Sequence, residues 1–122
     1  MQYMLLIYDD ESHWRDLPEG ERNSIMQEYF SFTEALRDSG KYVAGDALQP
    51  TGTAKSVQVR EGAPLTTDGP FAETKEQLGG YYLVDVDSED EALEWAARIP
   101  SARWGTIEVR PVVVFPVEAS AS

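Results

Sequence analysis

The sequence predicts one α+β domain in which two amphipathic helices cover one face of an antiparallel β-sheet. The chain has 122 residues, which is the usual size of a single domain. Hydrophobic residues make up 42% of it, with three Trp, six Tyr and four Phe, so a packed core can form. Strand-like and helix-like segments follow one another in the order β-α-β-β-(β)-α-β. This order is typical of a ferredoxin-like, split-βαβ layout with both helices on the same side.

The first half of the chain is predicted to hold a strand, a helix and a second strand. Residues 3–8 (YMLLIY) are rich in aliphatic side chains and tyrosine, which favours a buried strand, and residues 9–12 interrupt it as a polar loop. Pro18 suits the first turn of a helix, Gly40 suits its C-terminal end, and residues 42–48 follow as a strand. One face of this helix carries apolar side chains at helical spacing: Ile25, Tyr29, Phe32 and Leu36.

The second half is predicted to begin with a hairpin and to end with a helix and a strand. Residues 56–60 alternate between polar and apolar, as in a half-buried strand, and Glu61-Gly62 suits a turn. Ser88 and Glu91 form a capping box, which places the start of the second helix there. Two further strands are predicted, at residues 80–86 and 105–114.

The sheet face that the helices leave uncovered needs a cover of its own. Apolar residues in the predicted strands suggest that both faces of the sheet are partly apolar, and a second copy of the same sheet is the simplest cover. The sequence therefore predicts a homodimer. The residues that suggest it are Leu5, Tyr82, Val84, Val109 and Val113.

Composition excludes several classes of function. The formal charge of −12 repels phosphate backbones and anionic lipids, so we expect neither a nucleic acid nor a membrane as partner. No cysteine is present, and no glycine-rich phosphate motif, so we expect no cofactor and no metal. No signal peptide is visible, and we expect a cytoplasmic protein. The predicted domain spans residues 1–117, followed by a frayed tail at residues 118–122.

The most distinctive segment is residues 67–80, TDGPFAETKEQLGG. Asp68-Gly69-Pro70 predicts a turn, because glycine permits positive φ and proline fixes its own φ. Phe71 follows as a bulky side chain that could anchor the loop, and several charged residues come after it. The segment therefore predicts a shaped loop that could line a pocket.

With this segment, the chain resembles the branch of the YCII-related family that is named for its DGPF motif. The resemblance covers nearly the whole chain, and its longest block is far more specific than a short motif. The matching stretches are residues 3–8 (YMLLIY), 45–50 (GDALQP), 67–82 (TDGPFAETKEQLGGYY), 91–97 (EALEWAA) and 108–112 (EVRPV).

The resemblance implies a dimeric α+β barrel and says little about chemistry. Resemblance to the wider family implies an enzyme with a His–Asp pair in a cleft, and a relative acts as a dehydrochlorinase. The family's histidine falls in the region that matches residues 18–23, which contains no histidine here. The sole histidine, His13, comes earlier, and we assign it no role. Members of this branch are often encoded beside extracytoplasmic-function sigma factors, which implies a regulatory context.

Asp68 is the candidate catalytic residue, as a general base or a substrate anchor. The alternative is that its carboxylate caps the Asp-Gly-Pro turn. Glu73 and Lys75 could orient a polar ligand or form an exposed, weak ion pair. Arg110 could bind a carboxylate, or it could pair with Glu73, Glu108 or Asp46 across the sheet.

The remaining candidate ligand-binding residues are Asp46, Phe71 and Tyr82. Asp46 could point into a cleft or could be a solvated acid at the end of a strand. Tyr82, like Tyr8 and Tyr81, could stack on a flat ligand, although aromatic residues in strands more often belong to the core. The acidic residues 9–11 could hold a hard cation, but they lack the spacing of a calcium loop and favour a solvated loop.

We therefore interpret the chain as a YCII-like protein with a small-molecule pocket near the DGPF loop. Acid–base chemistry of the lyase or isomerase kind would suit it, with Asp68 as the acid or base. The alternative is a non-catalytic dimeric binding or regulatory module linked to a sigma-factor pathway. A third interpretation is a structural dimer whose loop only stabilises the barrel.

Overall fold

A computed structural model describes residues 1–116 of the chain, so the predicted domain end at residue 117 and the tail lie outside the described residues. Its elements are β1 (Gln2–Asp9), α1 (Glu11–Asp16), α2 (Glu19–Asp38), β2 (Tyr42–Ala47), η1 (Thr51–Thr53), β3 (Lys55–Arg60), β4 (Ala63–Asp68), β5 (Gln77–Asp85), α3 (Glu89–Arg98), η2 (Pro100–Arg103) and β6 (Thr106–Pro111). Within residues 1–116, no helix is both long and apolar enough to cross a membrane.

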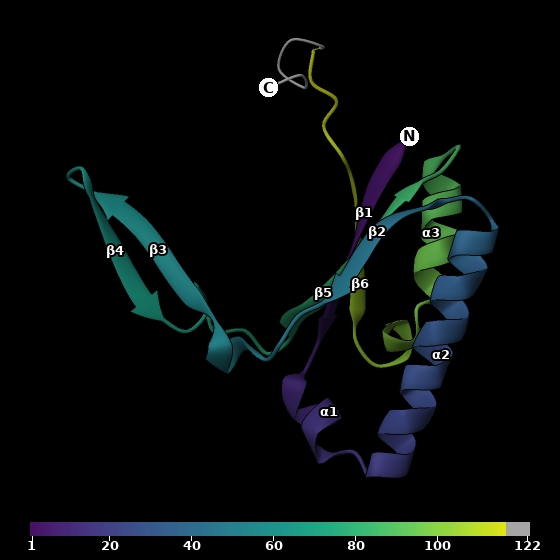
Figure 1. The fold of residues 1–122 in the computed structure, drawn as a ribbon, viewed down its shortest axis with the longest axis horizontal. Coiled ribbons are helices and arrows are strands. Elements are labelled where there is room, and N and C mark those ends of the chain that lie inside the picture. Colours follow the sequence, from purple (N-terminus) through teal and green to yellow (C-terminus); the bar gives the residue numbers. More distant parts are fainter. Residues whose placement is uncertain (117–122) are drawn as a thin grey trace.

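The predicted ferredoxin-like α+β fold is confirmed. Four strands form one sheet in the order β2-β5-β1-β6, and every neighbouring pair is antiparallel. Both long helices, α2 and α3, lie on the same side of this sheet (Figure 1). Within residues 1–116, neither long helix covers the other side of this sheet, so the sheet is open in the single chain.

The core lies between the sheet and the two long helices. Along β1, buried and half-buried residues alternate, so that every second side chain points toward the helices. The predicted stripe of α2 faces them: Phe32 and Leu36 are buried, while Ile25 and Tyr29 are half-buried. The largest fully buried side chains are Leu5, Leu36, Ile99, Val84 and Val86.

The helix ends follow the sequence closely, with one addition. The Ser88 side chain accepts a hydrogen bond from the backbone N–H of Glu91, which confirms the predicted cap of α3. Gly40 ends α2 with a φ of 78°, which favours glycine. The addition is α1, where a polar loop was expected, and Asp10 caps it by accepting from the N–H of Ser12 at 2.9 Å.

The prediction that both faces of the sheet are partly apolar rests on five residues. These residues do not lie on both faces. Leu5 is the register partner of both Tyr82 and Val109, so all three side chains point toward the helices. Val84 is in the same core cluster, and Val113 lies beyond β6. That part of the prediction is wrong because adjacent strands place register partners on one face.

Strands β3 and β4 do not join the main sheet. They pair with each other as a separate two-stranded hairpin, residues 55–68, which we call the arm. Glu61 and Gly62 both have positive φ, as a two-residue type I′ turn requires, so the predicted turn is confirmed. The prediction of a half-buried strand is wrong, because Val57 and Val59 are 62% and 61% exposed. The arm projects away from the body on the side opposite α2 and α3 (Figure 1).

Candidate functional site

The sheet face without helices, which we call the open face, combines apolar and ionisable side chains. Strand alternation places Met4, Leu6 and Leu83 there, and all three are half-buried in the single chain. Polar residues from all four strands share this face: Tyr8, Asp46, Tyr81, Glu108 and Arg110. Two of the predicted site residues, Asp46 and Arg110, are therefore on one surface.

Asp46 and Tyr81 form the first acid–phenol pair of the open face. They are register partners on β2 and β5, and the Tyr81 hydroxyl donates to Asp46 Oδ2 at 3.0 Å. This hydrogen bond, together with the negative charge of Asp46, raises the pKa of Tyr81. The phenol is therefore held in its protonated form, as a hydrogen-bond donor beside a carboxylate.

Tyr8, Glu108 and Arg110 form a second group on the neighbouring strands. Arg110 Nε lies 3.8 Å from Glu108 Oε2, so its partner is one of the three acids considered, but on the same strand and not across the sheet. Burial raises the pKa of Tyr8, the Glu108 carboxylate raises it further, and Arg110 acts in the opposite direction. A phenol, a carboxylate and a guanidinium thus meet on one side of β1 and β6.

The end of the sheet beside this group is closed by further polar contacts. Thr106 Oγ1 donates to Glu76 Oε1 at 3.0 Å, which ties the loop before β5 to β6. Trp104 Nε1 donates to Asp9 Oδ2 at 2.8 Å, and His13 packs on the Trp104 ring with centroids 5.3 Å apart. Sequence reasoning missed these partners, because they are distant in the chain and meet only through strand register.

The acidic residues 9–11, considered as a cation site or a solvated loop, each have a structural partner instead. Asp9 accepts from Trp104, and Asp10 caps α1, where its two hydrogen bonds with Ser12 lower the pKa of its carboxyl group. Glu11 accepts from the backbone N–H and the hydroxyl of Thr51, at 2.6 and 2.9 Å. Within residues 1–116, no group of three or more acidic or histidine side chains is arranged to hold a metal ion.

The segment at residues 67–80 forms the base of the arm and the lead into β5. The Gly69 N–H donates to the carbonyl of Ala54 at 2.8 Å, and Ser56 Oγ donates to the Gly69 carbonyl at 2.8 Å. Gly69 has a φ of 94°, which an L-residue rarely adopts. The DGPF turn therefore closes the hairpin where the arm leaves the body.

Asp68 lies at the end of β4, in the arm, with its side chain 87% exposed. Its carboxylate pairs with Lys55, its register partner on β3, and this pair replaces the predicted turn cap. Its role as a base stays a prediction, since its only side-chain partner within residues 1–116 is that lysine.

The other predicted ligand-binding residues lie apart from the open face. Phe71 is 85% exposed, so the expectation that it anchors the loop is wrong for the single chain. Glu73 and Lys75 are exposed and do not pair with each other in the described part of the chain. Tyr82 belongs to the core: its ring lies 5.1 Å from that of Phe32, and its hydroxyl bonds Thr33 Oγ1 at 2.7 Å.

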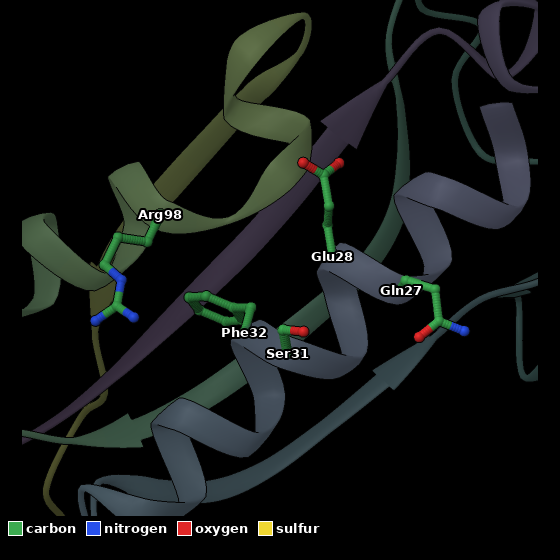
Figure 2. Close-up of a pocket in the computed structure, with 5 residues that line it drawn as sticks. All are labelled: Gln27, Glu28, Ser31, Phe32 and Arg98. Atoms are coloured by element: carbon green, nitrogen blue, oxygen red, sulfur yellow. The ribbon is translucent and has the colours of Figure 1, made fainter.

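A shallow groove of about 400 Å³ lies on the helical side of the molecule (Figure 2). Phe32 points from α2 toward α3, whose last residue is Arg98, and the Arg98 guanidinium lies 4.4 Å from the Trp95 ring centroid. Glu28 is engaged with Arg103 through two hydrogen bonds of 3.0 and 2.6 Å. The groove contains none of the predicted site residues. We therefore take the open face as the candidate site.

Three comparisons place the chain among known proteins. The YCII-related domain matches residues 1–116. An uncharacterised protein of Rhizobium meliloti (strain 1021) is 37% identical over 117 residues, which cover 94% of each protein. The fold is similar to that of 5-chloro-2-hydroxyhydroquinone dehydrochlorinase (TftG) from Burkholderia phenoliruptrix AC1100, solved in complex with 2,5-dihydroxybenzoquinone. That likeness has a TM-score of 0.58 and 14% identity, and covers 93% of this chain and 94% of the other.

Proposed function

We propose that this chain, which belongs to the YCII-related family, binds a small hydroxylated molecule on the open face of its sheet as a homodimer. The chemistry that suits this face is acid–base catalysis of the lyase or isomerase kind. The proposal places the protein in the DGPF branch and in the cytoplasm, without a nucleic-acid or membrane partner.

One observation carries the proposal: the open face pairs two tyrosine hydroxyls with two carboxylates and adds one guanidinium. Tyr81 lies beside Asp46, and Tyr8 lies near Glu108 and Arg110. The pKa of each tyrosine is raised, so each phenol keeps its proton at neutral pH and can act as a hydrogen-bond donor to a ligand oxygen. A carboxylate can take up a proton from a bound molecule, and a guanidinium favours an anionic oxygen.

The ligand class follows from these groups. Phenols, carboxylates and a guanidinium on a sheet flanked by Met4 and Leu6 suit a flat molecule with several oxygens. The dehydrochlorinase with a similar fold is bound to 2,5-dihydroxybenzoquinone, which has this character. This quinone is therefore a reasonable probe, while the natural ligand belongs to the broader class of small hydroxylated, ring-shaped molecules.

Isothermal titration of the full-length protein with 2,5-dihydroxybenzoquinone tests the proposal. We expect measurable binding, and we expect Arg110→Gln to raise Kd about tenfold, because a hydrogen bond to a charged group contributes roughly 1.5–3 kcal/mol. Arg15→Gln is the matched control, since Arg15 is an exposed arginine of α1 whose side chain is 72% exposed. Equal binding by all three proteins, or no binding and no co-purified small molecule by native mass spectrometry, contradicts the proposal.

The alternative is a non-catalytic binding or regulatory module linked to a sigma-factor pathway. Exposed apolar residues after β6 favour it, with Val113 68%, Val114 92% and Phe115 63% exposed. They border a second hollow of about 390 Å³ beside Met1 and Asp85. If the quinone does not bind and Val114→Ser leaves dimerisation unchanged while abolishing retention of a sigma-factor fragment on a column, this alternative is correct.

A further inference from the structure

The arm is a hairpin that gains almost no burial from its own chain. Every residue of β3 and β4 is exposed except the half-buried Ser56. An isolated two-stranded hairpin is at best marginally stable in water and needs a third strand, a helix or another surface to pack on. The arm nevertheless carries a valine pair, Val57 and Val59, on one face. The two valines therefore indicate a strand whose apolar face packs on a surface outside its own chain.

The total surface supports the same conclusion. The chain exposes 8501 Å². A compact monomer of 13.6 kDa would expose only about 6,600 Å² by the usual scaling with mass. The excess, about 1,900 Å², is larger than the roughly 800 Å² that each partner contributes to a standard interface. The exposed strands of the arm contribute to this excess, so a second copy that covers the arm would remove part of it.

The open face is the second unpartnered surface, and it lies on the side of the sheet from which the arm projects (Figure 1). A strand of six residues spans about 20 Å. A sheet of four strands is roughly 19 Å wide, at about 4.8 Å per strand. The arm of one copy is thus long enough to cross the open face of another.

Charge favours this contact over a direct contact between two bodies. In the arm, Lys55 and Arg60 balance Glu61 and Asp68, so the whole charge of −12 belongs to the rest of the chain. Two such bodies repel each other, whereas a neutral arm does not add to the repulsion. Arg60, next to the turn, bonds only the Val59 carbonyl, at 2.9 Å, and has no carboxylate partner within residues 1–116.

We propose that the arm of each copy lies across the open face of a second copy and completes the binding surface there. Val57, Val59 and Pro64, which share one face of the arm, pack on Met4, Leu6 and Leu83 of the other copy. Arg60 of one copy lies beside Asp46 and Glu108 of the other. The assignment rests on the open face being the binding surface, as in the proposed function, but not on the identity of the ligand.

The base of the arm is built to hold its direction. The Glu11 carboxylate, on α1, accepts hydrogen bonds from Thr51, which lies just before β3. The N–H of Gly69, just after β4, donates to the carbonyl of Ala54. The first contact ties the chain before β3 to the body, and the second joins the two ends of the arm to each other. On this assignment the DGPF turn positions the arm for exchange, which gives the most distinctive segment of the sequence a physical task.

Cross-linking locates the arm directly. The chain has no cysteine, so Val59→Cys provides one attachment point for a benzophenone maleimide. In a mixture of ¹⁴N and ¹⁵N chains, we expect photo-cross-links between light and heavy chains that map to peptides of β1 and β5. Gln58→Cys, on the opposite face of the arm, is the matched control and should give several-fold fewer such products. Cross-links only within one chain, or none, overturn the proposal.

Dimer dissociation, measured by analytical ultracentrifugation, gives the second test. We expect Val57→Ser with Val59→Ser to raise the dimer Kd at least tenfold, and Gln58→Ser to leave it unchanged. Arg60→Glu, which preserves the strand, should also raise Kd about tenfold, with a smaller effect at high salt. An unchanged Kd in both arm variants overturns the arm exchange. Quinone binding that is lost in Arg110→Gln but retained in both arm variants also overturns it, while the proposed function stands.

Discussion

The body and the arm use the same kinds of residue to opposite effect. In the body, β1 and β5 alternate apolar side chains toward two helices, and Leu5 and Val84 are completely buried. In the arm, Val57 and Val59 alternate in the same way, yet both remain exposed. Alternation therefore specifies a strand with one apolar face. It does not specify what covers that face, and this difference separates the part of the chain that has a core from the part that has none within residues 1–116.

The largest effect is expected in the centre of the body. Leu36 is 0% exposed, and Leu36→Ala should lower the free energy of unfolding by about 3 kcal/mol, because it removes buried methyl groups and leaves a cavity. Urea unfolding of protein diluted to a monomer measures this. Val59→Ala in the arm is the contrasting variant and should change little under the same conditions. A loss of similar size in both would abolish the distinction between body and arm.

A slightly smaller effect is expected where β1 approaches the turn before β6. A Cβ at Gly105 would lie 2.2 Å from the carbonyl oxygen of Tyr8, so Gly105→Ala must displace backbone atoms. We expect a loss of about 2 kcal/mol in the free energy of unfolding. Gly52→Ala is the matched control, because nothing lies within 4 Å of the added Cβ. Equal stability of the two variants would mean that this close approach is not present in solution.

The cap of α3 should give an effect of intermediate size. Ser88→Ala removes the acceptor for the Glu91 N–H and should cost about 1 kcal/mol. Ser24→Ala, at an exposed position of α2, is the control and should be within a few tenths of the parent. The two melting curves decide the matter, and coincident curves would show that the cap contributes nothing.

The smallest effect on stability is expected at the base of the arm. Asp68 and Lys55 form an exposed pair, so Asp68→Asn should change the free energy of unfolding by no more than about 0.5 kcal/mol. A larger loss would favour a structural role at the turn. An unchanged stability together with loss of quinone binding would restore Asp68 as a functional residue.

Much of the fold could be predicted because its signals are local. The helical spacing from Ile25 to Leu36, the Ser88 cap and the Glu61-Gly62 turn depend only on neighbours in sequence, and the structure contains all three. The short helix α1 was missed because an aspartate cap followed by few apolar residues resembles a polar loop.

The candidate site was predicted only in part. Asp46 and Arg110 share the open face as proposed candidates, whereas Asp68 lies in the arm and Tyr82 lies in the core. Shifting a strand by one residue moves every side chain to the other face, and register is decided by the partner strand. A single sequence without its pairing therefore cannot assign a tyrosine to the core or to the site.

By itself the sequence determined the elements, their order and the α+β class, since periodicity, caps and turns act within a few residues along the chain. Only the tertiary structure decided that β3 and β4 leave the sheet as an arm and that phenols and carboxylates meet on the open face. These outcomes depend on contacts between residues far apart in sequence, such as Tyr81 with Asp46 and Thr106 with Glu76. Their free energy is gained only after the chain has folded and brought the strands into register.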